Sequence, residues 1–313
     1  MSTQVEADLS GGLPLSEFLR LAPEEGLNES LWPGLAIFRA DKPATCIPVV
    51  YEPCICVVAH GRKQVHIGDE VISYDPLHYL VVGVPLPVEA EIVEASKEAP
   101  FLSLRLNIDI PMLSELLLDA KPDPGPDDAA RAIYASRMNS SLSGAVSRLL
   151  KSLHNVSDSR VLAPLAIREL LYHILIGEQG ERLRSVAMRD SRANRIAAVL
   201  RYLHKHSSQP LTVEELARRA SMSVSTFHHN FKSMTSLPPL QYLKMIRLHQ
   251  ARLLMLNDGL GAGEAAYSVG YNSASQFTRE FRRVFGAPPA REIKRLQSSS
   301  TESGESVTDA MNA

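Results

Sequence analysis

The pattern of apolar and polar positions in residues 34–109 predicts β-strands, and it alternates with the period of a strand in Phe101–Asp109. Phe101–Asp109 has leucine or isoleucine at every second position, which predicts a half-buried strand. Cys54–His60 is an apolar run rich in β-branched residues and predicts another strand. The segments on either side of Gly68-Asp69 predict a tight hairpin, because this dipeptide suits a turn with positive φ. Short strands at this spacing predict a small antiparallel barrel or sandwich.

From Met112 onward, apolar residues recur every three or four positions, which predicts helices. One of these segments, Val161–Ile176, is apolar over more than the narrow stripe that a single packing contact buries. We expect it to contact a second copy of the chain through Leu171 and Leu175, which would make the protein a homodimer. The polar segment Gly177–Arg189 is expected to link the two halves of the chain.

The sequence between residues 195 and 297 contains an internal repeat. Matching alanine, serine, phenylalanine and proline positions lie 49 residues apart before a turn and 50 residues apart after it. Each copy has the pattern of a short helix, a turn and a second helix, which is that of a helix-turn-helix unit. Between the copies, Pro239–Met255 predicts a helix of roughly 25 Å. This length suits two DNA-reading helices about one DNA turn apart.

The second helix of each copy is predicted to have one apolar and one polar face. The apolar faces contain Phe227 and Phe231 in the first copy, and Phe277 and Phe281 in the second. The polar faces are rich in side chains that bind base edges or phosphates. The candidate DNA-binding residues are Ser225, Thr226, His228, His229, Lys232, Ser275, Gln276, Arg279, Arg282 and Arg283.

The charge of the chain is unevenly distributed, although its net charge is only -2. Residues 1–190 carry 17 basic and 26 acidic side chains, whereas residues 191–297 carry 16 basic and 6 acidic ones. A basic second half favours a polyanionic partner. A basic surface that is merely solvated would be the alternative, but the paired reading helices favour double-stranded DNA.

With these motifs, residues 195–297 resemble the DNA-binding domain of the AraC/XylS family of bacterial transcription regulators. The resemblance is strongest in Glu264–Pro289, EAAYSVGYNSASQFTREFRRVFGAPP, which follows the family's signature along its whole length. The family often has an arginine at the position of His229. More loosely, the first 180 residues resemble the cupin-like N-terminal domain of one branch of the family, through Pro53–Lys63 and Tyr79–Gly83. That branch includes regulators of aldehyde-responsive genes.

The resemblance implies an α+β protein, in which a cupin-like β-barrel with a helical extension precedes an all-α DNA-binding domain. That second domain would contain two helix-turn-helix units joined by a linker helix. The expected divisions are an N-terminal segment (1–29), a cupin-like effector and dimerisation domain (30–180), a linker (181–194), the double helix-turn-helix domain (195–297) and a disordered tail (298–313).

A barrel can hold a small effector where its inward side chains leave room. Cys54 and Cys56 share one face of their strand, because residues i and i+2 point the same way. Two interpretations of them remain open. Both thiols are buried and inert, or one of them reacts with an electrophilic effector such as an aldehyde. The candidate effector-binding residues are Cys54, Cys56, His60, Tyr74 and Tyr79, with the alternating side chains of Leu102–Ile108 as further lining.

Neither a metal nor a cofactor is expected. The three cysteines match no four-ligand zinc pattern, and His60, His66 and His78 lack the close spacing of a metal-binding cupin. The sequence also contains no P-loop, dinucleotide fingerprint or nucleophile elbow, which argues against an enzyme.

The expected function is therefore a sequence-specific transcription regulator that binds promoter DNA, responds to a small effector and acts with RNA polymerase. Two alternatives remain: a DNA-binding domain fused to an enzymatic domain, or a DNA-binding protein whose barrel serves only to dimerise. No apolar run approaches the roughly 18 residues that cross a bilayer, so a cytoplasmic location without a membrane partner is expected.

Overall fold

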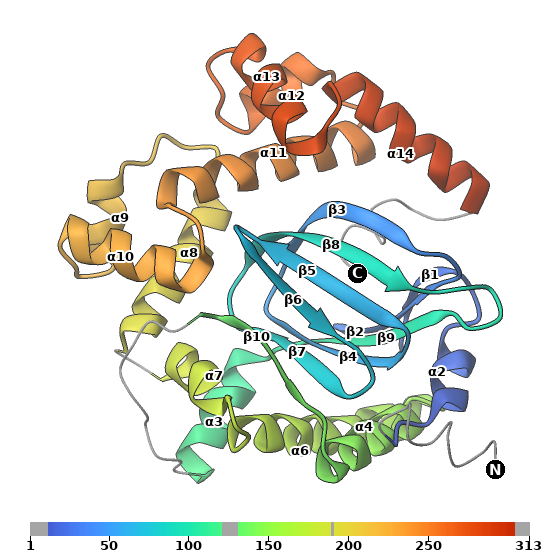
Figure 1. Cartoon of the computed structure of the whole chain (residues 1–313). Coiled ribbons are helices and arrows are strands. Elements are labelled where there is room, and N and C mark those ends of the chain that lie inside the picture. Colours follow the sequence, from blue (N-terminus) through green and yellow to red (C-terminus); the bar gives the residue numbers. More distant parts are fainter. Residues whose placement is uncertain (1–11, 121–130, 189–190, 304–313) are drawn as a thin grey trace.

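A computed structural model describes residues 12–120, 131–188 and 191–303, without the side chains of Cys46 and residues 298–303. In this part of the chain, a strand-rich N-terminal half has helices on one side and carries the helical C-terminal half on another (Figure 1). The predicted α+β class, with strands first and helix-turn-helix units last, is confirmed. Residues 121–130 and the last ten residues of the expected tail lie outside the described residues.

The strands form two antiparallel sheets whose inward faces share one core. The smaller sheet contains the hairpin predicted at Gly68-Asp69, where Ile67 pairs with Glu70 and Gly68 has a φ of 59°. In order across the smaller sheet, its strands are β3 (Ala44–Tyr51), β8 (Leu86–Glu94), β5 (Arg62–Ile67) and β6 (Glu70–Tyr74). In order across the larger sheet, its strands are β1 (Gly26–Glu29), β2 (Leu35–Ala40), β9 (Phe101–Asn107), β4 (Cys54–His60), β7 (His78–Val82) and β10 (Ile133–Arg137).

The two faces of the larger sheet contribute to different cores. Cys54 and Cys56 of β4 belong to the core between the sheets, whereas Leu102 and Leu104 of β9 belong to a core shared with helices outside the barrel. Ser103, on the opposite face of β9, is buried as well. The strand predicted at Phe101–Asp109 is therefore present as β9, with its leucine face buried beneath helices and Asn107 exposed. Ser103 departs from the half-buried pattern, because its face of the strand is directed toward the core between the sheets.

These covering helices lie below the barrel in Figure 1. Leu171 and Leu175 are fully buried in the core between these helices and the larger sheet. The expectation that these two leucines contact a second subunit is therefore wrong. Their apolar neighbours Val161, Leu162 and Leu165 are exposed. The helices are α2 (Leu15–Leu21), α3 (Ile110–Ala120), α4 (Ser140–Ser152), α5 (Val156–Val161), α6 (Ala163–Leu175) and α7 (Gly180–Ala187).

Four elements of this half were not predicted from the sequence. Strand β10 follows helix α3 and pairs with β7 at the edge of the larger sheet. Helix α2 buries Phe18 in the core between the larger sheet and the covering helices, which we call the outer core. Strand β1 pairs with β2. Helix α7 lies within the polar segment Gly177–Arg189, where we expected only a connection.

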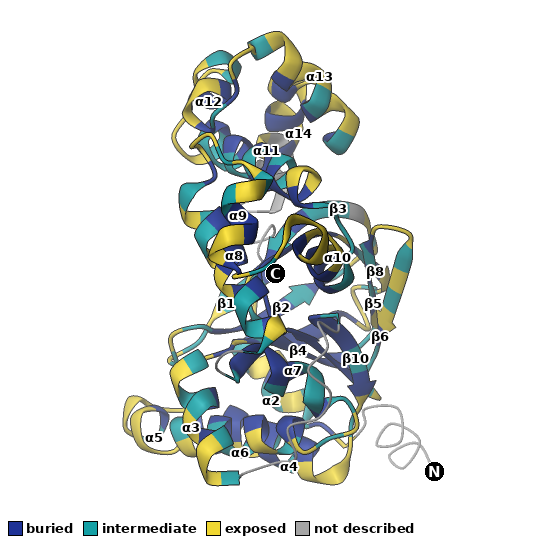
Figure 2. Cartoon of the chain, turned by 90° about the vertical axis from the view of Figure 1, so that its left-hand side faces the viewer, coloured by how far each residue is buried: buried dark blue, intermediate teal, exposed yellow. Residues whose placement is uncertain are grey.

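The C-terminal half contains the two predicted helix-turn-helix units and the helix between them. Phe227 and Phe231 are buried in the first unit, and Phe277 and Phe281 in the second, as their spacing predicts. Figure 2 shows buried and exposed positions along α10 and α13. The helices are α8 (Arg192–His206), α9 (Val213–Arg219), α10 (Val224–Thr235), α11 (Pro239–Asn257), α12 (Ala262–Ser268), α13 (Ala274–Phe285) and α14 (Pro289–Ser303).

The first helix-turn-helix unit shares its hydrophobic core with the barrel, whereas the second has a core of its own. Phe231 and Tyr242 belong to the same cluster of buried residues as Val65 and Leu86 of the barrel. The second cluster contains Phe277 and is assembled from α11, α12, α13 and α14. Within the described residues, every helix is too short or too polar to cross a membrane.

Candidate nucleic-acid interface and effector cavity

The two helix-turn-helix units, α9–α10 and α12–α13, have the same local construction. Ser223 and Ser273 cap the second helices by accepting hydrogen bonds from the backbone N–H groups of Thr226 and Gln276. Such caps satisfy N–H groups that the first helical turn leaves without partners. The C-terminal caps, Ser236 and Gly286, are both left-handed, with φ of 61° and 77°. The repeat seen in the sequence is therefore also a repeat of backbone conformation.

The turn inside each unit requires a left-handed residue. Ser221 in the first unit has a φ of 51°, and Gly270 in the second has a φ of 89°. Glycine adopts this region without the strain that a Cβ atom introduces. A Cβ atom at Gly270 would collide with the backbone carbonyl of Ser208, which follows α8. The second turn thus packs against the first unit at a position where only glycine fits.

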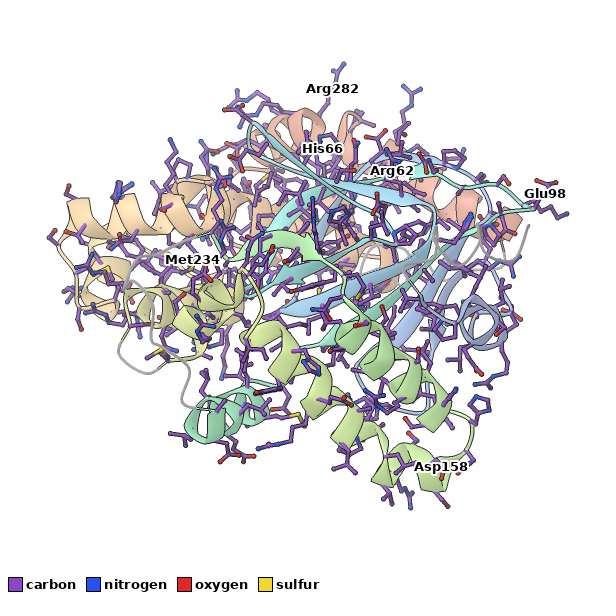
Figure 3. All side chains as sticks on the ribbon, turned by 60° about the horizontal axis from the view of Figure 1, so that its bottom comes forward. Arg62, His66, Glu98, Asp158, Met234 and Arg282 are labelled. Carbon is purple, nitrogen blue, oxygen red and sulfur yellow. The ribbon has the colours of Figure 1, made fainter. Side chains whose placement is uncertain are left out.

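The outward faces of α10 and α13 carry the predicted contacts. Every candidate DNA-binding residue is exposed, and Figure 3 shows Arg282 pointing away from the body of the molecule. The face of α10 contributes Ser225, Thr226, His228, His229 and Lys232, and the face of α13 contributes Ser275, Gln276, Arg279, Arg282 and Arg283. The two faces differ in charge, because α13 presents three arginines whereas α10 presents one lysine and two histidines.

Glu280, which we did not identify from the sequence, fixes one of these side chains. Its carboxylate accepts hydrogen bonds from Gln276 at 3.1 Å, Lys244 at 3.2 Å and Tyr271 at 2.9 Å. Burial alone would raise the pKa of Glu280, but these hydrogen bonds lower it. The ionised carboxylate therefore connects the reading helix α13 to the linker helix α11.

Helix α11 also connects the two units. The guanidinium of Arg247 donates to the backbone carbonyls of Ser207 at 2.7 Å and Gln209 at 2.8 Å, at the end of α8. Lys244, one turn earlier, forms the ion pair with Glu280 in the second unit. Helix α11 therefore binds both the end of α8 and the reading helix α13.

Arg252 joins α11 to the barrel and to α14. Its side chain is fully buried, donates to the carbonyl of Pro48 in β3 and lies 4.4 Å from the ring of Phe285. Glu292 of α14 lies 3.7 Å away and is also buried. Burial lowers the pKa of Arg252 to about 10, so the guanidinium keeps its charge at neutral pH.

The barrel interior contains a polar cluster around Cys54, Cys56 and Lys63. The two sulfur atoms lie 3.9 Å apart, and their hydrogen bond lowers the pKa of the Cys56 thiol and raises that of Cys54. Burial lowers the pKa of Lys63 to about 8, and its ammonium lies 5.5 Å from the ring of Tyr51. Both thiols are buried.

The structure brings together only some of the candidate effector-binding residues. Cys54, Cys56 and Tyr74 share the core between the sheets. His60 lies at the end of β4, where its Nδ1 is 2.9 Å from the carbonyl of Pro100. Tyr79 lies on the opposite face of the larger sheet, because it pairs with Val57 and not with a cysteine. The side chains of Leu102, Leu104, Leu106 and Ile108 also lie in the outer core, so they do not line the barrel.

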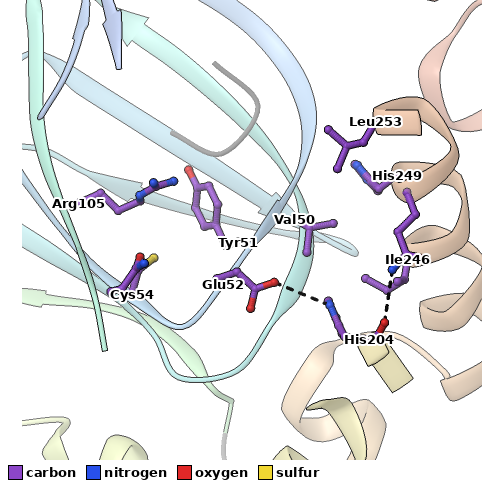
Figure 4. A pocket seen from close by; sticks show the side chains of 11 residues that line it. Val50, Tyr51, Glu52, Cys54, Arg105, His204, Ile246, His249 and Leu253 are labelled. Carbon is purple, nitrogen blue, oxygen red and sulfur yellow. Dashed lines mark hydrogen bonds and ion pairs between the residues drawn. The ribbon is translucent and has the colours of Figure 1, made fainter. Parts of the chain in front are cut away.

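A cavity of about 400 Å³ lies where the barrel meets α8 and α11 (Figure 4). Its barrel wall comes from the end of β3, the start of β4 and the end of β9. Its other wall comes from the helical half. The lining residues are Val50, Tyr51, Glu52, Cys54, Arg105, Asn107, His204, Ile246, His249, Gln250 and Leu253.

His204 forms a hydrogen-bonded chain at the edge of this cavity. Its Nε2 lies 2.7 Å from the hydroxyl of Tyr242, which donates to the carbonyl of Pro85 at 2.6 Å. Because that hydroxyl has one proton, Nε2 of His204 must be the donor to Tyr242. Nδ1 lies 3.8 Å from Glu52. Burial lowers the pKa of His204 to about 4, so the ring is neutral at pH 7.

Most residues of the cavity were missed in the sequence analysis. Of its lining, Cys54 was a named candidate, and Arg105 and Asn107 belong to the strand Leu102–Ile108 that was expected to supply further lining. Arg105 alternates with leucines in a strand pattern, and His204 and His249 lie in helices whose periodicity indicates only packing. No local motif marks them, because the cavity is assembled from segments that are distant in the sequence. In the described residues, no group of three or more His, Cys, Asp and Glu side chains is placed to hold a metal ion.

Comparison with known protein families identifies both halves. A family model of the AraC-type transcriptional regulator N-terminus matches residues 32–182, and a helix-turn-helix domain model matches residues 216–295. Together the two matches include more than two thirds of the chain.

Similar proteins agree with these families. The chain is 29% identical over 160 residues to the HTH-type transcriptional activator RhaS of Citrobacter koseri, a match covering 50% of this chain and 56% of that protein. It is 31% identical over 159 residues to RhaS of Escherichia fergusonii, with the same coverage. The chain thus spans about half the length of the curated relatives it matches. The solved structure of ToxT from Vibrio cholerae shares the fold with a TM-score of 0.55 at 12% identity, over 83% of this chain and 97% of that one.

The neutral, buried His204 predicts a stability that depends on pH. Its pKa in the folded protein is below the usual value of 6.5, so its contribution is complete above pH 6.5 and is lost as the pH falls towards 4. Each unit by which the pKa of the folded protein is lowered costs about 1.4 kcal/mol of unfolding free energy once the pH is below that pKa. We expect His204→Gln to reduce the pH dependence of the unfolding free energy, measured with urea between pH 5 and pH 7. The exposed His228→Gln is the control. An unchanged slope in His204→Gln would contradict the assignment.

Proposed function

The chain belongs to the AraC/XylS family of transcription regulators, and we propose that it binds double-stranded promoter DNA through the outward faces of α10 and α13. The observation that carries this proposal is the repeated reading helix. Two helices have the same serine cap, the same left-handed end and the same buried phenylalanines, and both present polar or basic side chains to solvent. Such faces bind phosphates and base edges.

The linker helix supports simultaneous contact of both units with one duplex. Helix α11 has 19 residues and is therefore about 28 Å long. One turn of DNA measures about 34–36 Å. Contacts of Lys244 and Arg247 at the two units limit their relative motion. The three arginines of α13 make it the more strongly bound of the two reading helices in this proposal.

The N-terminal half acts in this proposal as a sensor of a small effector. The cavity between the barrel and α11 favours this role over a barrel that serves only to dimerise. The proposal assigns no catalytic reaction to the chain. It places the protein in the cytoplasm, where its DNA-bound form would act on transcription by RNA polymerase.

We also propose that the protein is a homodimer, with its interface on the helices outside the barrel. The side chains of Val156, Val161, Leu162, Leu165 and Ile176 are exposed, although all are apolar. They lie on or beside α5 and α6, and a group of this kind typically marks an interface. This surface replaces the one that we expected around Leu171 and Leu175.

Substitutions in the two reading helices test DNA binding. Arg279→Ala removes a guanidinium that can bind guanine with two hydrogen bonds, so we expect a loss of about 1–3 kcal/mol at one base position. Lys232→Ala should weaken binding to all sequences alike if the lysine contacts phosphate. Fluorescence anisotropy with a panel of singly mutated promoter sites measures both effects.

Arg137→Ala, at an exposed arginine of β10, is the matched control and should bind DNA as the wild type does. Affinity should also fall steeply as salt is raised, because bound phosphates release counterions. Unchanged affinity and base preference in Arg279→Ala would refute its assignment. Failure of the wild type to bind any promoter fragment would refute the proposed function.

The dimer proposal is tested by charge on the exposed apolar group. Val161→Glu combined with Leu165→Glu should produce monomers, because burying two carboxylates in an interface is costly. Sedimentation velocity at micromolar concentration measures the change. Leu77→Glu, at another exposed leucine outside this group, should remain dimeric. A wild-type monomer under these conditions would contradict the proposal.

A further inference from the structure

The cavity between the barrel and α11 has a wall from each half of the protein. Tyr51, Cys54 and Arg105 belong to the barrel side, and Ile246 and Leu253 belong to α11 (Figure 4). A molecule held there would touch the sensor and the DNA-binding half at once. The volume of the cavity, about 400 Å³, is within the range of about 300–1,000 Å³ that is usual for small-molecule sites.

Arg105 provides an uncompensated positive charge in this cavity. Within the described residues, it forms neither an ion pair nor a hydrogen bond, and its Nε atom is buried without a partner. Buried charged groups in folded proteins are normally paired. Of the residues that line the cavity, only Glu52 is acidic, and it lies near His204 with most of its side chain exposed. The cavity therefore presents a guanidinium without a bound carboxylate.

A second polar atom on the opposite wall also lacks a partner. His249 of α11 is 2% exposed, and its Nε2 has no hydrogen-bond partner in the described part of the chain. Burial holds the pKa of His249 well below its usual value, so the ring is neutral and can donate one hydrogen bond. Ile246 and Leu253 give this wall an apolar surface beside the polar side chain of Gln250.

We propose that this cavity is the effector site and that it binds a small organic carboxylate. The carboxylate pairs with the guanidinium of Arg105, and the apolar body of the acid packs against Ile246 and Leu253. Arginine and carboxylate match in geometry as well as charge, and their hydrogen bonds are stronger where water is excluded. This inference deepens the proposed function and rests on it for the role of the ligand, but not for its binding.

The location of the site also gives the ligand a route to the DNA-binding half. Helix α11 connects the two helix-turn-helix units, and its Arg252 donates to the carbonyl of Pro48 in β3. A bound acid adds contacts between the barrel and this helix. If the acid binds the free protein and the DNA-bound protein with different affinities, it changes the affinity of the protein for DNA by the same factor.

The test uses the full chain and straight-chain acids from acetate to decanoate, together with benzoate, each paired with its neutral amide. We expect at least one acid to raise the melting temperature and to bind in isothermal titration, whereas its amide does neither. Arg105→Gln should weaken binding of that acid by about ten- to a hundred-fold, and Arg105→Lys should retain part of it. Arg137→Gln, at an exposed arginine of β10, is the matched control and should bind as the wild type does.

Leu253→Trp fills the cavity without changing its charge and should also abolish binding, so the proposal remains testable if Arg105→Gln does not fold. The proposal is overturned if no acid in the series binds, if acids and amides bind equally, or if Arg105→Gln binds as the wild type does. Binding of promoter DNA by the unliganded protein is measured separately. A chain that binds the acid but no DNA would refute the proposed function and leave the carboxylate site intact.

Discussion

The packing of α11 against both the barrel and the first helix-turn-helix unit is the constraint on which the rest of the structure depends. Tyr242 and Ile246 of this helix belong to the same buried cluster as Leu86 of the barrel and Phe231 of α10. The barrel core and the first helix-turn-helix core are therefore a single hydrophobic core. Removing apolar area from either side destabilises both, because close-packed interiors transmit the loss of contacts.

This shared core fixes the position of everything that the function needs. It holds α10 next to the barrel, and α11 binds the second unit through Lys244 and the end of α8 through Arg247. The cavity is located at the edge of the same contact, so its occupant touches the element that positions both reading helices. The second unit has a separate core and is tied to the barrel at Arg252, which makes that side of the contact polar.

The DNA-binding half was largely predictable from the sequence, because its determinants are local. Phe227, Phe231, Phe277 and Phe281 recur at helical spacing, and two copies of the motif reinforce each other. The hairpin at Gly68-Asp69 was also predictable, because its turn depends on two adjacent residues. In each case the physical cause, a period or a turn, operates within a few residues of the chain.

Other features were not predictable, because they depend on which segments meet. Leu171 and Leu175 have the pattern of an exposed apolar stripe until the barrel beneath them is known. Strand β10 exists because the edge of β7 is available to pair with it. Arg105 becomes a candidate ligand-binding residue only because α11 closes the cavity opposite it. The burial of Glu280 depends in the same way on α11.

Hydrogen exchange measured by mass spectrometry tests the shared core most directly. Val65→Ala removes two methyl groups from the barrel side of that core, far in the sequence from the DNA-binding half. If the core is continuous, protection must fall together in the barrel, α8 and α10, while α13 keeps its own protection. Wild-type protection of α8 and α10 in this variant, with loss confined to the barrel, would show that the barrel and the first helix-turn-helix unit have separate cores.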